Sequence, residues 1–176
     1  FAARFPDAVC GVITLLVLYG IGRRLRGEAF GLLWALAYVG SILPHLYFRS
    51  GIIDPWFNLF IFLGIDRFIR MGSRHRFIDP VLGGVFLGMA VMTKGPVGVL
   101  IPGLTVAVML VLSRFRLRLP WGRLLLLASV TVVTLGLWFA VDLMRNGPTF
   151  AVAFYWRQMA MLTTEDAGHG GFFGYH

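Results

Sequence analysis

The stretch "MAVMTKGPVGVLIPG", residues 89–103, joins two apolar runs through the only lysine of the chain, Lys94. A charge is costly inside an apolar environment, so the chain is expected to reach water at this point. Gly95 and Pro96 follow directly. Glycine permits a close reversal, and proline is favoured in the first turn of a helix because it has no N–H to satisfy there. The stretch therefore predicts two apolar helices that meet in a tight turn beside Lys94.

The same apolar character extends over the whole chain. Its 176 residues are 58% hydrophobic with a mean hydropathy of +0.79, whereas soluble domains contain about 45–50% apolar residues. No long stretch alternates apolar with polar residues, so strands are not expected. The sequence predicts an all-α, polytopic membrane helix bundle with six hydrophobic segments: 7–22, 29–48, 55–69, 81–93, 97–112 and 124–143. The third and fourth are shorter than the roughly 17–25 residues of a usual span.

The basic residues predict the orientation of these segments. The net charge is +8, and 11 of the 16 basic residues lie in three alternate loops, 23–26, 67–76 and 114–123. By the positive-inside rule these loops are cytoplasmic, so the other loops and both ends of the sequence face the outside. This arrangement accounts for the positive charge without a nucleic-acid partner.

Two basic residues of the outer loops, Lys94 and Arg49, are candidates for binding an anion. Lys94 lies beside a helix start, where free backbone N–H groups and the positive end of the helix dipole favour a phosphate. The alternative is a lysine that extends to the lipid headgroups. Asp54-Pro55 is a typical helix start with Asp54 as the cap. Arg49 could pair with Asp54 or face an anionic ligand.

The final segment differs in composition from the rest. Residues 1–143 are predicted to form the helix bundle, and residues 144–176 an external loop with an interfacial helix in which Arg157 lies among aromatic residues. Glu165, Asp166 and His169 follow among glycines. Acid and histidine side chains can bind a divalent metal, but their spacing matches no strong metal motif, and a solvated loop is the alternative.

Four pieces of the sequence carry a family resemblance: "RFPDAVCGVITLLVLYGIGRRLRG", "RSGIIDPWFNLFIF", "GMAVMTKGPVGVLIPG" and "TTEDAGHGGFFGYH". In this order they resemble polyprenyl-phosphate-sugar-dependent glycosyltransferases of the GT-C superfamily, including the bacterial aminoarabinose transferases that modify lipid A and the protein mannosyltransferase-like enzymes. The resemblance implies an enzyme of the bacterial inner membrane. Its donor would be a sugar on a polyprenyl phosphate such as undecaprenyl phosphate, and its acceptor a lipid A, protein or glycan molecule on the outer face.

The resemblance also implies roles for individual residues. Lys94 would contact the lipid phosphate of the donor, with Arg49 and Arg157 as further phosphate or acceptor contacts and His169 as a metal ligand. The catalytic carboxylate of the family lies in a loop that would precede Phe1, so no catalytic residue is assigned. We therefore expect this sequence to be a piece of a longer enzyme, inactive by itself, whose external tail covers the active-site cavity.

A membrane transporter or channel subunit is the competing interpretation. Charges inside the membrane mark transport routes, but this sequence has few, and its two halves show no inverted repeat. Asp66, Asp79 and Asp142 lie near the ends of segments, where they can cap helices or pair with arginines. A purely structural scaffold would leave Lys94 and the glycine-rich tail unexplained.

Overall fold

The structure, a computed structural model, describes residues 5–42, 44, 46, 48, 52–73, 77–114, 120–147, 149, 152, 153 and 156. These residues form helices and turns, with no strand among them. The helices are α1 (Phe5–Arg26), α2 (Glu28–Val39), α4 (Asp54–Ser73), α5 (Ile78–Lys94), α6 (Val97–Leu112) and α7 (Trp121–Asn146). The predicted all-α class is confirmed, and each of the six hydrophobic segments contributes a helix.

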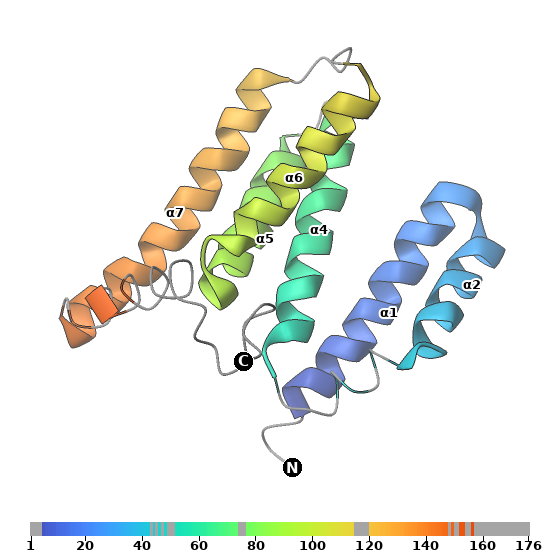
Figure 1. Ribbon diagram of the computed structural model, residues 1–176, viewed down its shortest axis with the longest axis horizontal. Coiled ribbons are helices and arrows are strands. Elements are labelled where there is room, and N and C mark those ends of the chain that lie inside the picture. The colour runs from blue at the N-terminus through green and yellow to red at the C-terminus, as the bar shows by residue number, and fades with distance from the viewer. Residues whose placement is uncertain are drawn as a thin grey trace, which may run out of the picture.

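Successive helices run back and forth along a shared direction, as Figure 1 shows. Helix α5 lies at the centre of one group, where it packs against α4, α6 and α7. Helices α1 and α2 form a hairpin beside α4. Because each helix reverses the direction of the one before it, the turns after α1, α4 and α6 gather at one end of the bundle, and the turn after α5 lies at the other.

The helices differ in how readily they could cross a membrane. Within the described residues, α1 and α7 are long and apolar enough to do so, whereas α2 and α6 are shorter apolar helices. Helix α4 has 20 residues, which corresponds to about 30 Å, the thickness of a hydrocarbon core. The third segment is therefore longer than predicted, since its helix continues to Ser73 and includes charged residues. Helix α5, with 17 residues, stays short.

The second segment is not one continuous helix over 29–48. Helix α2 ends at Val39, and the Gly40 N–H donates to the Leu36 carbonyl at 2.8 Å. The reason lies four residues further on, where Pro44 has no N–H to donate and its ring would clash with the carbonyl of Gly40 in a continuous helix. Helical backbone returns at residues 42, 44, 46 and 48.

The described basic residues are divided between the two ends of the bundle. One end carries the larger group: Arg23, Arg24, Arg26, Arg67, Arg70, Arg114 and Arg123. The other end carries Lys94 and Arg145. The predicted gathering of alternate basic loops at one end is thus confirmed for the described residues, and which side of the membrane that end faces stays a prediction.

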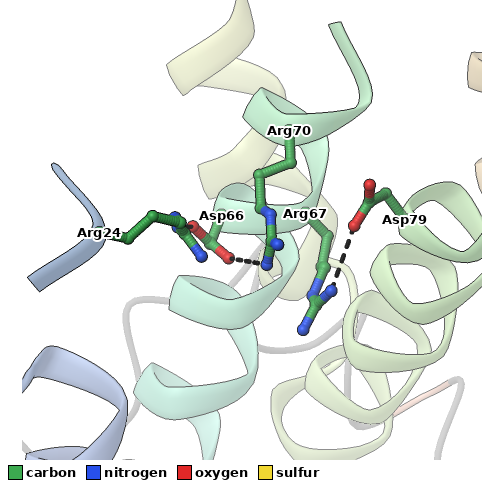
Figure 2. Close-up of polar contacts among 5 residues, drawn as sticks. All are labelled: Arg24, Asp66, Arg67, Arg70 and Asp79. Atoms are coloured by element: carbon green, nitrogen blue, oxygen red, sulfur yellow. Dashed lines mark hydrogen bonds and ion pairs between the residues drawn. The ribbon is translucent and has the colours of Figure 1, made fainter. Parts of the chain in front are cut away.

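Several of these arginines connect helices through ion pairs (Figure 2). Arg24 of α1 binds the Asp66 carboxylate of α4, and Arg70 lies 3.6 Å from the same carboxylate. Arg67 of α4 donates to Asp79 of α5 at 3.1 Å, and the Asp79 side chain is only 2% exposed. The expectation that Asp66 and Asp79 could pair with arginines is confirmed. These pairs fix the arginine-rich ends of α1, α4 and α5 relative to one another.

Helices α5 and α7 come into backbone contact at a glycine. A Cβ added to Gly84 would lie 2.6 Å from the carbonyl oxygen of Leu127. The Thr131 hydroxyl contacts both carbonyls, at 3.2 Å from Gly84 and 2.9 Å from Leu127. Small residues that let helix backbones approach closely are typical of helix pairs in membranes.

Replacing Gly84 by Ala should therefore destabilise the bundle by about 1–3 kcal/mol, since the new methyl group has no room. Gly136→Ala is the matched control, because nothing lies within 4 Å of a Cβ at that position of α7. Alanine there should be neutral or stabilising by up to about 1 kcal/mol. Thermal unfolding in detergent, followed by circular dichroism, compares the two variants. Equal midpoints would contradict the close approach of α5 and α7.

Asp79→Ala should lower the free energy of unfolding by about 3–5 kcal/mol, because it leaves the Arg67 guanidinium without its buried partner. Glu28→Gln provides the comparison, since Glu28 pairs with Arg23 at 3.5 Å and both side chains are more than half exposed. An exposed pair of this kind contributes about 1 kcal/mol or less. The unfolding midpoints of both variants, measured in the same detergent, compare the two losses of stability. A smaller loss for Asp79→Ala than for Glu28→Gln would contradict a stabilising role of the Arg67–Asp79 pair.

Candidate functional site

Lys94 forms an ion pair with Asp54 at the end of the bundle opposite the arginine-rich end. The Lys94 Nζ contacts the Asp54 Oδ1 and also lies 5.3 Å from the centre of the Phe57 ring. Lys94 is the last residue of α5, and both of its partners belong to the first turn of α4. We refer to Lys94, Asp54 and Phe57 as the Lys94 site.

The helix ends favour this pair electrostatically. A cation is stabilised at the C-terminus of a helix and an anion at the N-terminus, and Lys94 and Asp54 occupy these positions on α5 and α4. Asp54 does not serve as the predicted cap. The first backbone hydrogen bond of α4 runs from the Phe57 N–H to the Ile53 carbonyl at 3.2 Å, so Ile53 occupies the cap position, and the Asp54 carboxylate contacts Lys94 instead.

The site rests on the hydrophobic core. Phe57, Ile61 and Ala90 form a buried cluster, and Val97 packs against it from the first turn of α6. Phe57 thus contributes to the core through its ring and at the same time offers the ring face to the ammonium, a contact worth about 0.5–2 kcal/mol. A lysine fixed by a buried ring and a carboxylate keeps its ammonium in a defined place.

The turn after Lys94 is tight. Gly95 has φ of 69°, which favours glycine, and its N–H donates to the Val91 carbonyl at 2.7 Å. A Cβ on Gly98 would lie 2.6 Å from the Val91 nitrogen, so α6 begins in backbone contact with α5. The predicted turn between two helices is confirmed.

The expected row of free N–H groups at the start of α6 is only partly present. The Gly98 N–H donates to the Gly95 carbonyl and the Val99 N–H to the Pro96 carbonyl, both at 3.0 Å. Both N–H groups donate within the turn, because the turn between α5 and α6 is tighter than the sequence suggested. The capacity of the site to bind an anion therefore depends mainly on the Lys94 ammonium.

The ammonium is accessible to a ligand. The Lys94 side chain is 39% exposed and the Asp54 side chain 28%. An ammonium has three N–H donors, and one carboxylate oxygen accepts from it here. The arrangement can bind a phosphate and balance negative charge that develops on it. A group of three or more side chains suited to a metal ion does not occur within the described ranges.

Three further site residues are predicted from the sequence. Arg49, Arg157 and His169 lie outside the described residues, as does most of the tail 144–176. The structure brings Lys94 together with Asp54, a pairing that the sequence analysis did not identify, since it offered Arg49 as the partner of Asp54. One signal could have found it: Asp54 and Lys94 flank consecutive segments that end on the same predicted side of the membrane.

A bundle of apolar helices with its basic residues at the two ends is the architecture of an integral membrane protein, and the Lys94 site adds a fixed, accessible cation at one end. Residues 1–138 match the family described as dolichyl-phosphate-mannose-protein mannosyltransferase. The chain belongs to this family.

Individual relatives are more distant. The chain is 25% identical to the undecaprenyl phosphate-alpha-4-amino-4-deoxy-L-arabinose arabinosyl transferase of Edwardsiella ictaluri, with 100% of this chain and 33% of the relative covered. It is 26% identical to the enzyme of the same name, numbered 1, from Sodalis glossinidius, with 96% and 30% covered. The chain thus spans about one third of the length of these curated relatives. No solved structure matches it.

Proposed function

We propose that this chain is part of an integral membrane glycosyltransferase that uses a sugar linked to a polyprenyl phosphate, and that Lys94 binds the phosphate of this donor. The observation that carries the proposal is the fixed, partly exposed Lys94 ammonium at a helix end. Family membership supports the reaction class. The relatives' names specify undecaprenyl phosphate and an amino-sugar, which supports undecaprenyl phosphate as the lipid carrier.

The chemistry required of Lys94 is charge stabilisation. An acceptor hydroxyl attacks the first carbon of the sugar and loses its proton, while the bond from that carbon to the phosphate oxygen breaks and the polyprenyl phosphate leaves with an added negative charge. A fixed ammonium beside the phosphate stabilises that charge more strongly in a site poor in water than in bulk water. Asp54 positions the ammonium and balances its charge before the donor binds. Because Asp54 is engaged by Lys94, it is not assigned as the base that takes the hydroxyl proton.

We place the Lys94 site on the outer side of the membrane on the basis of the arginines. With the arginine-rich end in the cytoplasm, Lys94 faces the outer side of the bacterial inner membrane, where we place both ends of the sequence and the transfer to a lipid A, protein or glycan acceptor. Arg49 and Arg157 are proposed as further phosphate or acceptor contacts, and His169 as a ligand for a divalent metal. Arg157 and His169 belong to the segment 144–176, which we propose to be external and to cover the site.

The proposal predicts that Lys94→Gln weakens binding of undecaprenyl phosphate to the full-length protein in nanodiscs. A hydrogen bond to a charged group contributes about 1.5–3 kcal/mol, so affinity should fall about tenfold or more. Glutamine is chosen because its amide can still donate to Asp54, which limits the loss of stability.

Arg145→Gln is the matched control, since Arg145 lies at the same end of the bundle, in the last turn of α7, and is exposed. This variant should bind as the wild type does. Equal affinities of wild type and Lys94→Gln, at equal unfolding midpoints, would overturn the donor-binding role and favour a lysine that only contacts lipid headgroups.

A further inference from the structure

A crevice separates the α1–α2 hairpin from α4 at the arginine-rich end of the bundle. Its volume is about 310 Å³. One part is lined by the charged side chains of Arg24, Asp66 and Arg70, and the rest mainly by apolar side chains such as Leu25 and Trp34. The crevice is remote from the Lys94 site, which lies at the opposite end of the same helices. The proposed transfer reaction makes no use of it.

The charged part of the crevice has an excess of positive charge. Among the side chains that line the crevice, the Asp66 carboxylate pairs with two guanidinium groups, those of Arg24 and Arg70. The Asp66 side chain is 10% exposed, whereas that of Arg24 is 31% exposed. A guanidinium has five N–H donors in a planar fork that suits phosphate oxygens.

The remaining walls are apolar and partly open to the outside. Leu25 is 62% exposed and Ile69 51% exposed, and both line the crevice beside the arginines. Trp34 and Phe62 also line the crevice and pack edge-on against each other, with the ring centres 6.1 Å apart. A small anion in water gains nothing from such walls, whereas an acyl chain does, since each buried methylene contributes about 0.8 kcal/mol.

We propose that this crevice binds an anionic phospholipid, with the headgroup phosphate on Arg24 and Arg70 and an acyl chain along Leu25, Ile69 and Trp34. Basic pockets between membrane helices on the cytoplasmic side are suited to anionic headgroups. The bound lipid would fill the space between the α1–α2 hairpin and α4 and so stabilise their contact. This assignment depends on the membrane location of the bundle and not on the transferase chemistry.

Native mass spectrometry of the detergent-purified full-length protein tests the proposal, with phosphatidylglycerol and phosphatidylcholine of identical acyl chains as the probes. An arginine near an anionic headgroup contributes about 1 kcal/mol, which corresponds to about a fivefold preference for phosphatidylglycerol. Arg24→Gln should abolish this preference. The control Arg26→Gln should keep it, since Arg26 belongs to the same helical turn but lies over the Phe30 ring at 5.9 Å.

A second variant tests the apolar walls without a change of charge. Ile69→Trp should fill the crevice and lower binding of both lipids, with phosphatidylglycerol losing most, even if Arg24→Gln fails to fold. Millimolar inorganic phosphate should leave phosphatidylglycerol bound. Equal binding of the two lipids by the wild type would overturn the proposal. Three other results would also overturn it. These are an equal loss of the phosphatidylglycerol preference in Arg24→Gln and Arg26→Gln, unchanged lipid binding in Ile69→Trp, and complete displacement of phosphatidylglycerol by inorganic phosphate.

Discussion

A charged side chain in an apolar bundle needs an opposite charge nearby, and this requirement positions much of the structure. Helices α4 and α5 run antiparallel and are joined by an ion pair at each end, Arg67–Asp79 at one and Asp54–Lys94 at the other. Between the two pairs lie apolar residues and glycines that allow close packing. Since α6, α7 and the α1–α2 hairpin are arranged around these two helices, the pairs fix the frame on which the rest depends.

The two ion pairs differ in a way that separates a structural role from a binding role. Asp79 is almost completely buried, so the carboxylate of this pair has little contact with solvent or ligands. Lys94 and Asp54 are both partly exposed, and their pair combines a defined position with access. A phosphate that reaches Lys94 meets a cation whose place is already set by Asp54 and Phe57, so less conformational entropy is lost on binding than for a mobile lysine.

Much of the fold could be predicted from the sequence because it depends on local patterns. Long apolar runs predict the helices, Gly95-Pro96 predicts the turn, and the spacing of arginines predicts which loops share an end. The break after α2 was missed although Pro44 signals it, because the apolar run continues through it. The extension of α4 to Ser73 was missed because Asp66, Arg67 and Arg70 resemble a loop until their partners on α1 and α5 are known.

The site was less predictable than the fold. Lys94 was identified from its isolation among apolar residues, but its partner depends on how α4 and α5 are rotated against each other, which no local pattern encodes. The closure of the turn by the Gly98 and Val99 N–H groups likewise depends on the contact between α5 and α6. The roles of Arg49, Arg157 and His169 stay predictions.

The most direct test of the central claim, that Lys94 has a binding role beyond its pairing with Asp54, is a double-mutant cycle on undecaprenyl phosphate affinity. It compares wild type, Lys94→Gln, Asp54→Asn and the double variant of the full-length protein in nanodiscs. If the ammonium itself contacts the phosphate, Lys94→Gln should reduce affinity about tenfold in the Asp54→Asn background as well as in the wild type. If Lys94→Gln has no effect once Asp54 is neutral, the lysine acts only through the ion pair, and the binding role is contradicted.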